Sequence, residues 1–421
     1  MAARLTQRRV LVMADQGVSG LSNVVVSIFV ARSLPDTGFG AFGVAAIVAM
    51  LTLGVSRALI GEPLLSRFSR VTAEARRHLV PDMLGAALVV AAAAALVVAV
   101  AGLLVGGDAG SALVVLALVL PLIVVQDTWR YAFIHDRPAA SLAVDLVWLA
   151  GVFVALPLAP ASAEAPWYVA AWGLTAGIGA VCGQVLGRSA VVHLPHPFRW
   201  LRQNGDMGVR FLGEFATGQA VGQSVLLGVG AIAGLSVLGA VRAAQTFFGP
   251  INTIHAGIFL ALVPEGAQAR DDPARLRRLM MAASGLLASV AVVWTLFGLA
   301  LPDSAGAQLF GASWSDASGL IGFMGLAMIS GSVATGGLTG LRALGAARSS
   351  LRARMETAPP QLALPLGGTA LGGGGGYVVG YWLAHTASAA IYWTEFLRAL
   401  RFSQTQHGVV DDLTRVPVRS G

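Results

Sequence analysis

Residues 82–106 read DMLGAALVVAAAAALVVAVAGLLVG, and this stretch decides the fold class. Asp82, at its first position, is the only charged residue in it. A helix of about 20 apolar residues is long enough to cross the hydrocarbon core of a bilayer, and it satisfies its own backbone hydrogen bonds there. We therefore expect residues 82–106 to form a transmembrane helix.

The composition of the whole chain agrees with this segment. Of 421 residues, 56% are hydrophobic and 12% are charged, whereas a soluble domain has about 25% charged residues. A soluble protein of this length would need more charge to cover its surface. The net charge is +7, but the basic residues form small clusters between apolar segments. The composition therefore excludes a soluble enzyme, a nucleic-acid-binding protein and a disordered protein.

Similar apolar segments occur on both sides of residues 82–106. The twelve predicted spans are 10–31, 39–60, 82–106, 111–134, 139–159, 167–187, 209–233, 236–263, 279–301, 316–341, 360–375 and 376–400. They are continuously apolar and longer than the strands of about 10 residues that alternate in a membrane barrel. The predicted fold class is therefore all-α, a polytopic membrane protein with about twelve transmembrane helices.

The positions of the arginines predict the topology, because cytoplasmic connections of membrane proteins are rich in basic residues. With the N-terminus in the cytoplasm, 26 of the 28 arginines fall on the cytoplasmic side, while Arg32 lies outside and Arg242 within a span. Both termini are therefore expected to be cytoplasmic. The chain has no lysine, which together with abundant Ala, Gly and Val is typical of a high-G+C bacterial genome. We expect it in the cytoplasmic (inner) membrane of a bacterium.

A faint internal repeat predicts two halves. Sliding the chain by 199 residues places Val10 on Val209 and Asp15 on Glu214. Repeats of this kind are common in transporters. The expected organisation is a six-helix bundle at 1–190, a cytoplasmic linker at 191–208, a second six-helix bundle at 209–401 and a disordered cytoplasmic tail at 402–421.

Charged side chains inside the spans are candidates for function, because a charge at the centre of a membrane helix costs about 2.5–3.5 kcal/mol on insertion scales. They are Asp15, Asp145, Glu214 and Arg242. We expect them to face a cavity or a partner, and the three acids to bind a coupling ion, H⁺ or Na⁺. For Asp145 a structural role is equally open.

Uncharged polar side chains also recur at helical spacing within the spans. The candidates for substrate binding among them are Asn23, Gln219, Gln223 and Asn252. Together with the charged residues they predict a hydrated cavity between the halves. A similar stripe, Ser332, Thr335 and Thr339, is more typical of interhelical hydrogen bonds.

Two charged pairs lie near the predicted cytoplasmic ends of the spans. Asp127 and Arg130 are three residues apart and are expected to form an interfacial ion pair. Arg57 and Glu62 are expected to reach toward the headgroups on long side chains. A second role stays open for Arg57 and Arg130, as cations at the cytoplasmic mouth of the cavity.

Other patterns carry less chemistry. The glycine run Gly372–Gly376 has no strand before it and no Lys after it, so it is not a phosphate-binding loop. It predicts a tight turn or a close approach between the last two spans. The histidines show no zinc-site spacing, and we expect no metal and no cofactor.

Two classes of function remain, a transporter and a membrane enzyme such as a polyprenyl-dependent glycosyltransferase or ligase. Such an enzyme typically needs a large outer loop, or an acidic pair in the first outer connection, to hold a metal and an acceptor. The first outer connection has only Asp36, and no nucleophile with its base is apparent. We therefore expect a transporter and not an enzyme.

Four motifs resemble the Wzx-type polysaccharide flippases of the multidrug/oligosaccharidyl-lipid/polysaccharide (MOP) superfamily. They are ADQG at 14–17, ARSL at 31–34 with GFG at 38–40, RALIGEPL at 57–64, and QDTWRY at 126–131. The chain lacks the additional helices of the fourteen-helix lipid II flippases. It also lacks, by sequence, the dense acidic cluster that many drug and cation antiporters of the superfamily carry in their N-terminal half.

The resemblance implies a flippase that moves an oligosaccharide linked to polyprenyl pyrophosphate to the outer leaflet by alternating access, for cell-surface polysaccharide biosynthesis. Its partners would be the lipid-linked glycan, membrane lipids, a polysaccharide polymerase and glycosyltransferases. A pyrophosphate requires a cation in a cavity of low dielectric constant, and Arg242 is the deepest, with Arg57 and Arg130 at the mouth. The alternative within the superfamily is a MATE-like multidrug or cation antiporter.

Overall fold

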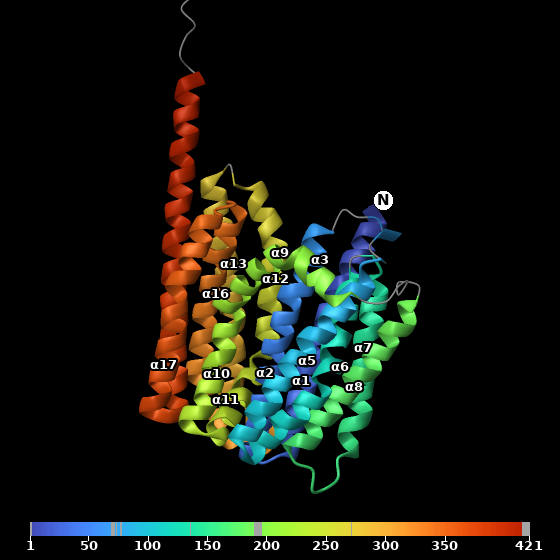
Figure 1. Cartoon of the computed structure of the whole chain (residues 1–421). Helices are drawn as coiled ribbons and strands as arrows, with labels where there is room; N and C mark the ends of the chain where they lie inside the picture. The colour runs from blue at the N-terminus through green and yellow to red at the C-terminus, as the bar shows by residue number, and fades with distance from the viewer. Residues whose placement is uncertain are drawn as a thin grey trace, which may run out of the picture. The chain divides into compact units, whose positions relative to one another are not determined.

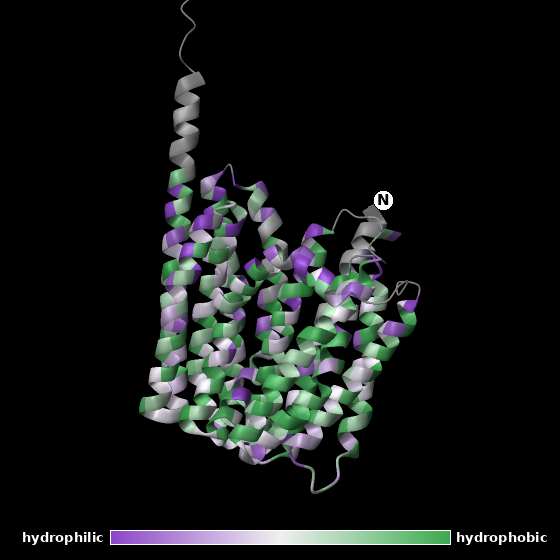
Figure 2. Ribbon diagram, in the orientation of Figure 1, coloured by the Kyte–Doolittle hydropathy of each residue, from purple (hydrophilic) through white to green (hydrophobic). Residues whose placement is uncertain are grey.

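The computed structural model describes residues 2–68, 72, 74–75, 78–134, 136–188, 196–270 and 272–414. Every regular element in these residues is a helix (Figure 1). The predicted all-α fold is therefore confirmed. In Figure 2, hydrophobic residues run along the middle of the helices, and hydrophilic residues gather around α3 (Glu62–Arg67) and α9 (Pro197–Thr217).

Among the described residues, seven helices are long and apolar enough to cross a membrane. They are Asp36–Arg67, which comprises α2 (Asp36–Ser56), η1 (Arg57–Gly61) and α3; α5 (Val80–Val105); α6 (Gly107–Ile134); α7 (Pro138–Ala155) with η2 (Leu156–Leu158); α8 (Ala165–Leu186); α13 (Pro273–Ala300); and α16 (Ile321–Ala343). The helices α9 and α10 (Gln219–Ala233) are bent by 47° at their junction and form an eighth if they are one span. The chain is thus a polytopic membrane protein.

The remaining predicted spans are interrupted or shorter in the structure. The first falls in α1 (Ala2–Ser33), of which Gly17–Ser33 is a short apolar helix. Span 236–263 is divided into α11 (Leu235–Phe247) and α12 (Gly249–Gln268). The last two lie in α17 (Ala347–Thr414). The exact number of twelve crossings stays a prediction.

The helices group into two compact units. Unit 1 comprises Met1–Thr246 and Pro302–Ser318, and unit 2 comprises Phe247–Leu301 and Gly319–Gly421. These bounds differ from those of the predicted halves, because α9 packs on α5 and η1, and α10 packs on α2, all within unit 1. The two six-helix halves stay a prediction. Residues 191–195 of the predicted linker lie outside the described residues, and α9 begins at Pro197.

The central helix of unit 1 is α6, which packs against α2, α5, α7 and α8. Glycines of α8 allow this close packing: a Cβ atom added at Gly183 would lie 2.5 Å from Cγ of Trp129. Trp129 is fully buried and stacks on Phe133 with 5.2 Å between ring centroids. Since protein interiors are close-packed, this contact determines how α6 is oriented, and α6 carries Gln126, Asp127 and Arg130.

A π-helical turn, η1, interrupts the helix that α2 begins. Single π turns insert one extra residue and turn the following side chains around the helix axis. The carbonyl oxygen of Leu59 in this turn accepts a hydrogen bond from Nε1 of the buried Trp200 on α9 at 3.3 Å. The turn begins at Arg57, and α9 packs directly on it.

Unit 2 contains α17, a helical hairpin with a glycine break between its two arms. Gly372 and Gly373 leave the helical conformation, and Gly373 has φ of 55°, which favours glycine. Gly368 then faces Gly376 so closely that neither position has room for a Cβ atom. The glycine run therefore makes both the turn and the close approach that the sequence predicts.

The second arm of α17 continues to Thr414, into the segment predicted to be a disordered tail. Residues 415–421 lie outside the described residues. The core of unit 2 is built where this hairpin meets α13 and α16. Its fully buried members include Leu276, Met280, Leu341 and Phe396.

A buried ion-pair network as candidate functional site

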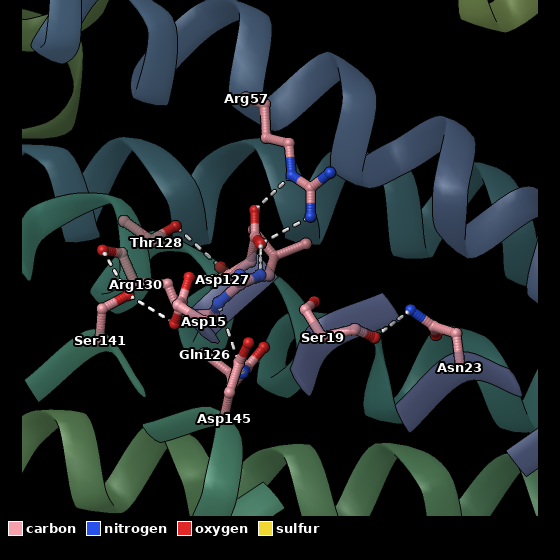
Figure 3. Close-up of polar contacts among 11 residues, drawn as sticks. Asp15, Ser19, Asn23, Arg57, Gln126, Asp127, Thr128, Arg130, Ser141 and Asp145 are labelled. Carbon is pink, nitrogen blue, oxygen red and sulfur yellow. Dashed lines mark hydrogen bonds and ion pairs between the residues drawn. The ribbon is translucent and has the colours of Figure 1, made fainter. Parts of the chain in front are cut away.

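A network of charged and polar side chains joins four elements of unit 1. It consists of Asp15 from α1, Arg57 from η1, Gln126, Asp127 and Arg130 from α6, and Ser141 and Asp145 from α7 (Figure 3). The helix α7 packs against both α1 and α6, and η1 packs on α6. We call this set the ion-pair network.

Arg130 is the centre of the network. Its Nη2 lies 2.9 Å from Oδ2 of Asp15, its Nε 2.8 Å from Oδ1 of Asp145, and its Nη1 3.3 Å from Oδ1 of Asp127. The contact with Asp145 is a charge contact, since the N–H of Nε is not directed at an acceptor. The Arg130 side chain is 7% exposed, and those of Asp15 and Asp145 are fully buried. One guanidinium therefore serves three carboxylates.

Arg57 binds Asp127 from the other side. Its Nε and Nη2 donate hydrogen bonds of 2.8 Å to the two oxygens of Asp127, the bidentate geometry that makes arginine–carboxylate pairs strong. The guanidinium also lies over the ring of Tyr131, 5.9 Å from its centroid. Arg57 thus pairs within the protein instead of reaching toward headgroups, and the expected Asp127–Arg130 pair forms and is buried in the protein.

The network contains three aspartates and two arginines, so it has one more negative than positive charge when all are ionised. Burial of an unbalanced charge is costly. Oδ1 of Asp145 accepts a hydrogen bond from Gln126 at 2.8 Å, whereas its buried Oδ2 has no hydrogen-bond partner among the described residues. Ser141 donates to Oδ1 of Asp15 at 3.0 Å. A bound proton or small cation at Asp145 would balance the charge.

The network corrects one expectation from the sequence. The N-terminal part of the chain does hold a dense acidic cluster, because Asp15, Asp127 and Asp145 meet around Arg130. Within the described parts of the chain, no three His, Cys, Asp or Glu side chains are placed to share a metal ion. The three carboxylates instead share the guanidinium of Arg130.

A small, partly open pocket lies beside Arg57, and the 170 Å³ of empty space in it includes open solvent. It is lined by Ser56, Arg57, Ile60, Gly61, Asp127, Thr128 and Tyr131. The Arg57 side chain is 34% exposed, whereas that of Asp127 is 5% exposed. Of the two arginines in the network, Arg57 is therefore the more exposed.

The structure does not bring all predicted site residues into this network. Glu214 and Gln219 are exposed, on α9 and at the start of α10. Gln223 is half-buried on α10, and its Oε1 has no hydrogen-bond partner among the described residues. Asn23 donates to the carbonyl of Ser19 in its own helix at 3.0 Å. These four residues take no part in the ion-pair network.

Arg242 and Asn252 also lie elsewhere. Arg242 is half-buried on α11, where its Cγ would be 3.5 Å from a Cβ atom placed at Gly43 of α2. Asn252 is exposed on α12 and belongs to unit 2. In unit 2, His255 contacts Oγ of Ser332 through Nε2 at 2.9 Å.

The stripe of hydroxyl side chains on α16 has mainly a local role. Ser332, Thr335 and Thr339 each donate to the carbonyl oxygen four residues earlier in the same helix. Serine and threonine often do this inside helices. The interhelical hydrogen bonds expected for this stripe are therefore replaced by bonds within the helix, apart from the contact of Ser332 with His255.

Sequence reasoning missed three members of the network. Asp127 was expected at the interface, and Gln126 and Ser141 were not singled out as site residues. A local signal exists for each: Gln126 and Asp127 belong to the QDTWRY motif, and Ser141 precedes Asp145 by four residues, which places both on one helix face. What the sequence does not show is that these faces of α6 and α7 meet α1.

Comparison with solved structures identifies the fold. An inward-facing multidrug resistance MATE family transporter of the MOP superfamily superposes with a TM-score of 0.70 at 12% identity, over 91% of this chain and 95% of that chain. A MATE protein in complex with MaL6 has a TM-score of 0.60 at 14% identity, over 94% and 95%. A MOP superfamily transporter from Pyrococcus furiosus, described as having a binding pocket of reverse polarity that suggests a different function, has 0.57 at 14%, over 93% and 94%.

At these identities the similarity concerns the fold alone. The chain has the MATE-like fold of the MOP superfamily over most of its length, as the sequence motifs led us to expect. No protein-family model matches the sequence, and no curated protein matches it.

Proposed function

We propose that this chain is a MOP superfamily transporter that flips oligosaccharide linked to polyprenyl pyrophosphate across the cytoplasmic membrane of a bacterium, by alternating access, for cell-surface polysaccharide. The fold supports a transporter, and the four motifs support the substrate class. The observation that carries the proposal is Arg57, a partly exposed guanidinium on the wall of a pocket in a largely apolar helix bundle.

The pyrophosphate of such a cargo needs a cation that can rearrange its partners. Arginine binds phosphate oxygens through its planar fork, most strongly where water is scarce. Arg57 meets these conditions, because it is 34% exposed, whereas Arg130 is 7% exposed and contacts three carboxylates. We therefore propose that Arg57 binds the pyrophosphate of the cargo and that Arg130 stays paired with the three carboxylates. Arg242, half-buried on α11, is a second cation proposed for the pyrophosphate.

The sugars of the cargo need hydrogen-bonding side chains. Asn23, Gln219, Gln223 and Asn252 are the residues proposed for this purpose. Gln219 and Asn252 are exposed, and Gln223 has a carbonyl oxygen without a hydrogen-bond partner among the described residues. Asn23 uses its amide nitrogen within α1 and keeps its side-chain oxygen for a further contact.

The surplus carboxylate of the ion-pair network supports coupling to H⁺ or Na⁺. Asp15 and Asp145 are fully buried, and both are held by Arg130, so binding or loss of a cation changes the charge balance of a closed site. Glu214 lies outside this network on α9, and the coupling role is assigned to Asp15 and Asp145.

A second candidate is a MATE-like antiporter of cationic drugs. Three buried carboxylates in one cluster favour it, because acids are the natural partners of a cationic cargo. The two candidates differ in the role of Arg57, which would attract a pyrophosphate and repel a cation. Loss of drug resistance in a deletion strain, with unchanged surface glycan, would favour the antiporter.

Glycan export in a strain that lacks the gene tests the proposal. Wild-type protein should restore export, and Arg57→Gln or Arg242→Ala should each reduce it by about tenfold or more, since a lost charge-assisted hydrogen bond costs about 1.5–3 kcal/mol. Arg67→Gln is the matched control, because Arg67 pairs with the exposed Asp206 away from the pocket. Full export by the Arg57 variant, at normal amounts in the membrane, would exclude Arg57 as the pyrophosphate ligand.

A further inference from the structure

We propose that cargo binding and proton uptake are positively linked in this protein through the exchange of one ion pair. A phosphate group of the cargo replaces Asp127 as the partner of Arg57, and the ion-pair network then binds a proton. The inference rests on the proposed function, because it takes Arg57 as the ligand of the cargo phosphate. It goes further by naming the residue pair that connects the cargo with the coupling ion.

Arg57 and Asp127 occupy the same pocket wall, which makes the exchange accessible. The pocket is lined by both residues, and two hydrogen bonds, each 2.8 Å long, join Arg57 to Asp127 (Figure 3). Tyr131 supports the guanidinium from its ring face. Arg57 lines this pocket and Arg130 does not, so a phosphate oxygen that approaches from the pocket meets Arg57 first.

The charge balance predicts the consequence of this exchange. With Arg57 paired to Asp127, three carboxylates face two guanidinium groups, an excess of one negative charge. When Arg57 turns to a phosphate, the same three carboxylates are left with Arg130 alone, an excess of two. Asp127 keeps only the contact of 3.3 Å with Arg130. A buried carboxylate without a cationic partner is costly, and binding a proton removes its charge.

The other charged groups around this pair do not replace Arg57. Asp15, Asp145 and Glu62 are acids, and Glu62 interacts electrostatically with Arg57 and with the acid Glu214 on α9. Tyr131 is neutral and lies against Arg57. Among the described side chains that face Asp127, Arg130 is the only cation besides Arg57.

The step is a simple transfer in which no covalent bond other than an O–H bond changes. Arg57 keeps its proton and exchanges the Asp127 oxygens for phosphate oxygens. One proton from the solvent binds a carboxylate oxygen of the network, and Asp127 is the carboxyl group that has lost its partner. By reciprocity, a lower pH must then strengthen phosphate binding by the same factor.

Calorimetric titration of the purified full chain with inorganic pyrophosphate measures this linkage. Titrations in two buffers of different ionisation enthalpy give the number of protons taken up per pyrophosphate bound. We expect uptake approaching one proton per pyrophosphate in the wild type. In the pH range where one full proton is taken up, the affinity for pyrophosphate should fall by about tenfold for each unit by which the pH rises. Asp127→Asn should remove this uptake, and any uptake that remains belongs to pyrophosphate itself.

Controls separate the linkage from the proposed function. Asp206→Asn disrupts a comparable arginine–aspartate pair with Arg67 outside the network and should leave uptake unchanged. If Asp127→Asn does not fold, infrared difference spectra of the wild type should show a new protonated carboxyl band on addition of pyrophosphate.

Pyrophosphate binding that depends on Arg57 but produces no such band, or that takes up as many protons in Asp127→Asn as in the wild type, overturns the linkage and leaves the proposed function intact. Binding that is absent, or unchanged in Arg57→Gln, overturns the proposed role of Arg57 itself.

Discussion

At the scale of single residues, Arg130 holds together side chains from three helices. Its guanidinium is the common partner of Asp15, Asp127 and Asp145. A buried ion pair adds little stability over a well-packed apolar substitute, but removal of one partner leaves a buried charge without compensation. We therefore expect Arg130 to be needed for folding as well as for the proposed ion coupling, whereas the proposed exchange of partners belongs to Arg57, which is partly exposed.

We predict that Arg130→Gln lowers the free energy of unfolding by about 3–5 kcal/mol, because three buried carboxylates lose their shared cation. Adding Asp15→Asn to this variant should restore part of the loss by removing one of the charges. Thermal unfolding of the purified protein in detergent measures both effects. Arg67→Gln, which breaks an exposed pair, should change stability by about 1 kcal/mol or less. An equal loss of stability in Arg130→Gln and Arg67→Gln would contradict the central role of Arg130.

At the scale of elements, α6 is positioned by tight contacts with its neighbours. Trp129 fills the space left by Gly183 on α8 and by Gly187 at its end, and Trp129 directly precedes Arg130 on α6. On the other side, η1 places Arg57 against the same helix. Small residues at such crossings allow close backbone approach in membrane proteins, so the geometry of the ion-pair network depends on the packing of Trp129, which is adjacent to Arg130 in the chain.

Gly183→Ala is predicted to destabilise unit 1 by about 1–3 kcal/mol, since the added methyl group overlaps Trp129. Gly213→Ala on α9 is the matched control, because nothing lies within 4 Å of a Cβ atom at that position. The control variant should be neutral or slightly more stable, as alanine favours helices over glycine. Thermal unfolding compares the two. A Gly183 variant as stable as the wild type would show that α6 and α8 can separate without cost.

At the scale of the whole molecule, the chain shares its fold with transporters of the MOP superfamily. The MATE-like neighbours share 12–14% of their residues with it, and one of them is described by a pocket of reverse polarity. Fold similarity therefore leaves the cargo to be argued from side chains. In this chain those are a partly exposed arginine and a buried set of carboxylates in the same unit.

The proposed ion coupling concerns the whole molecule and is tested in membrane vesicles. The double variant Asp15→Asn/Asp145→Asn should abolish the dependence of glycan export on a proton or sodium gradient, because both buried acids lose their charge. Glu214→Gln should keep that dependence, since Glu214 is exposed on α9 and outside the network. Gradient dependence that persists in the double variant, or that disappears with Glu214→Gln, would place the coupling site elsewhere.

The amino-acid sequence was sufficient for the fold class, the glycine turn in α17 and the charged residues worth considering. Each of these depends on local properties: the length of an apolar segment, the backbone freedom of glycine, and the cost of a charge in lipid. The meeting of Asp15, Asp127 and Asp145 at Arg130 required the folded structure, because these residues come from α1, α6 and α7 and more than 100 positions separate the first from the others. Which helix faces touch is decided by packing between distant segments, and no local pattern in the chain records it.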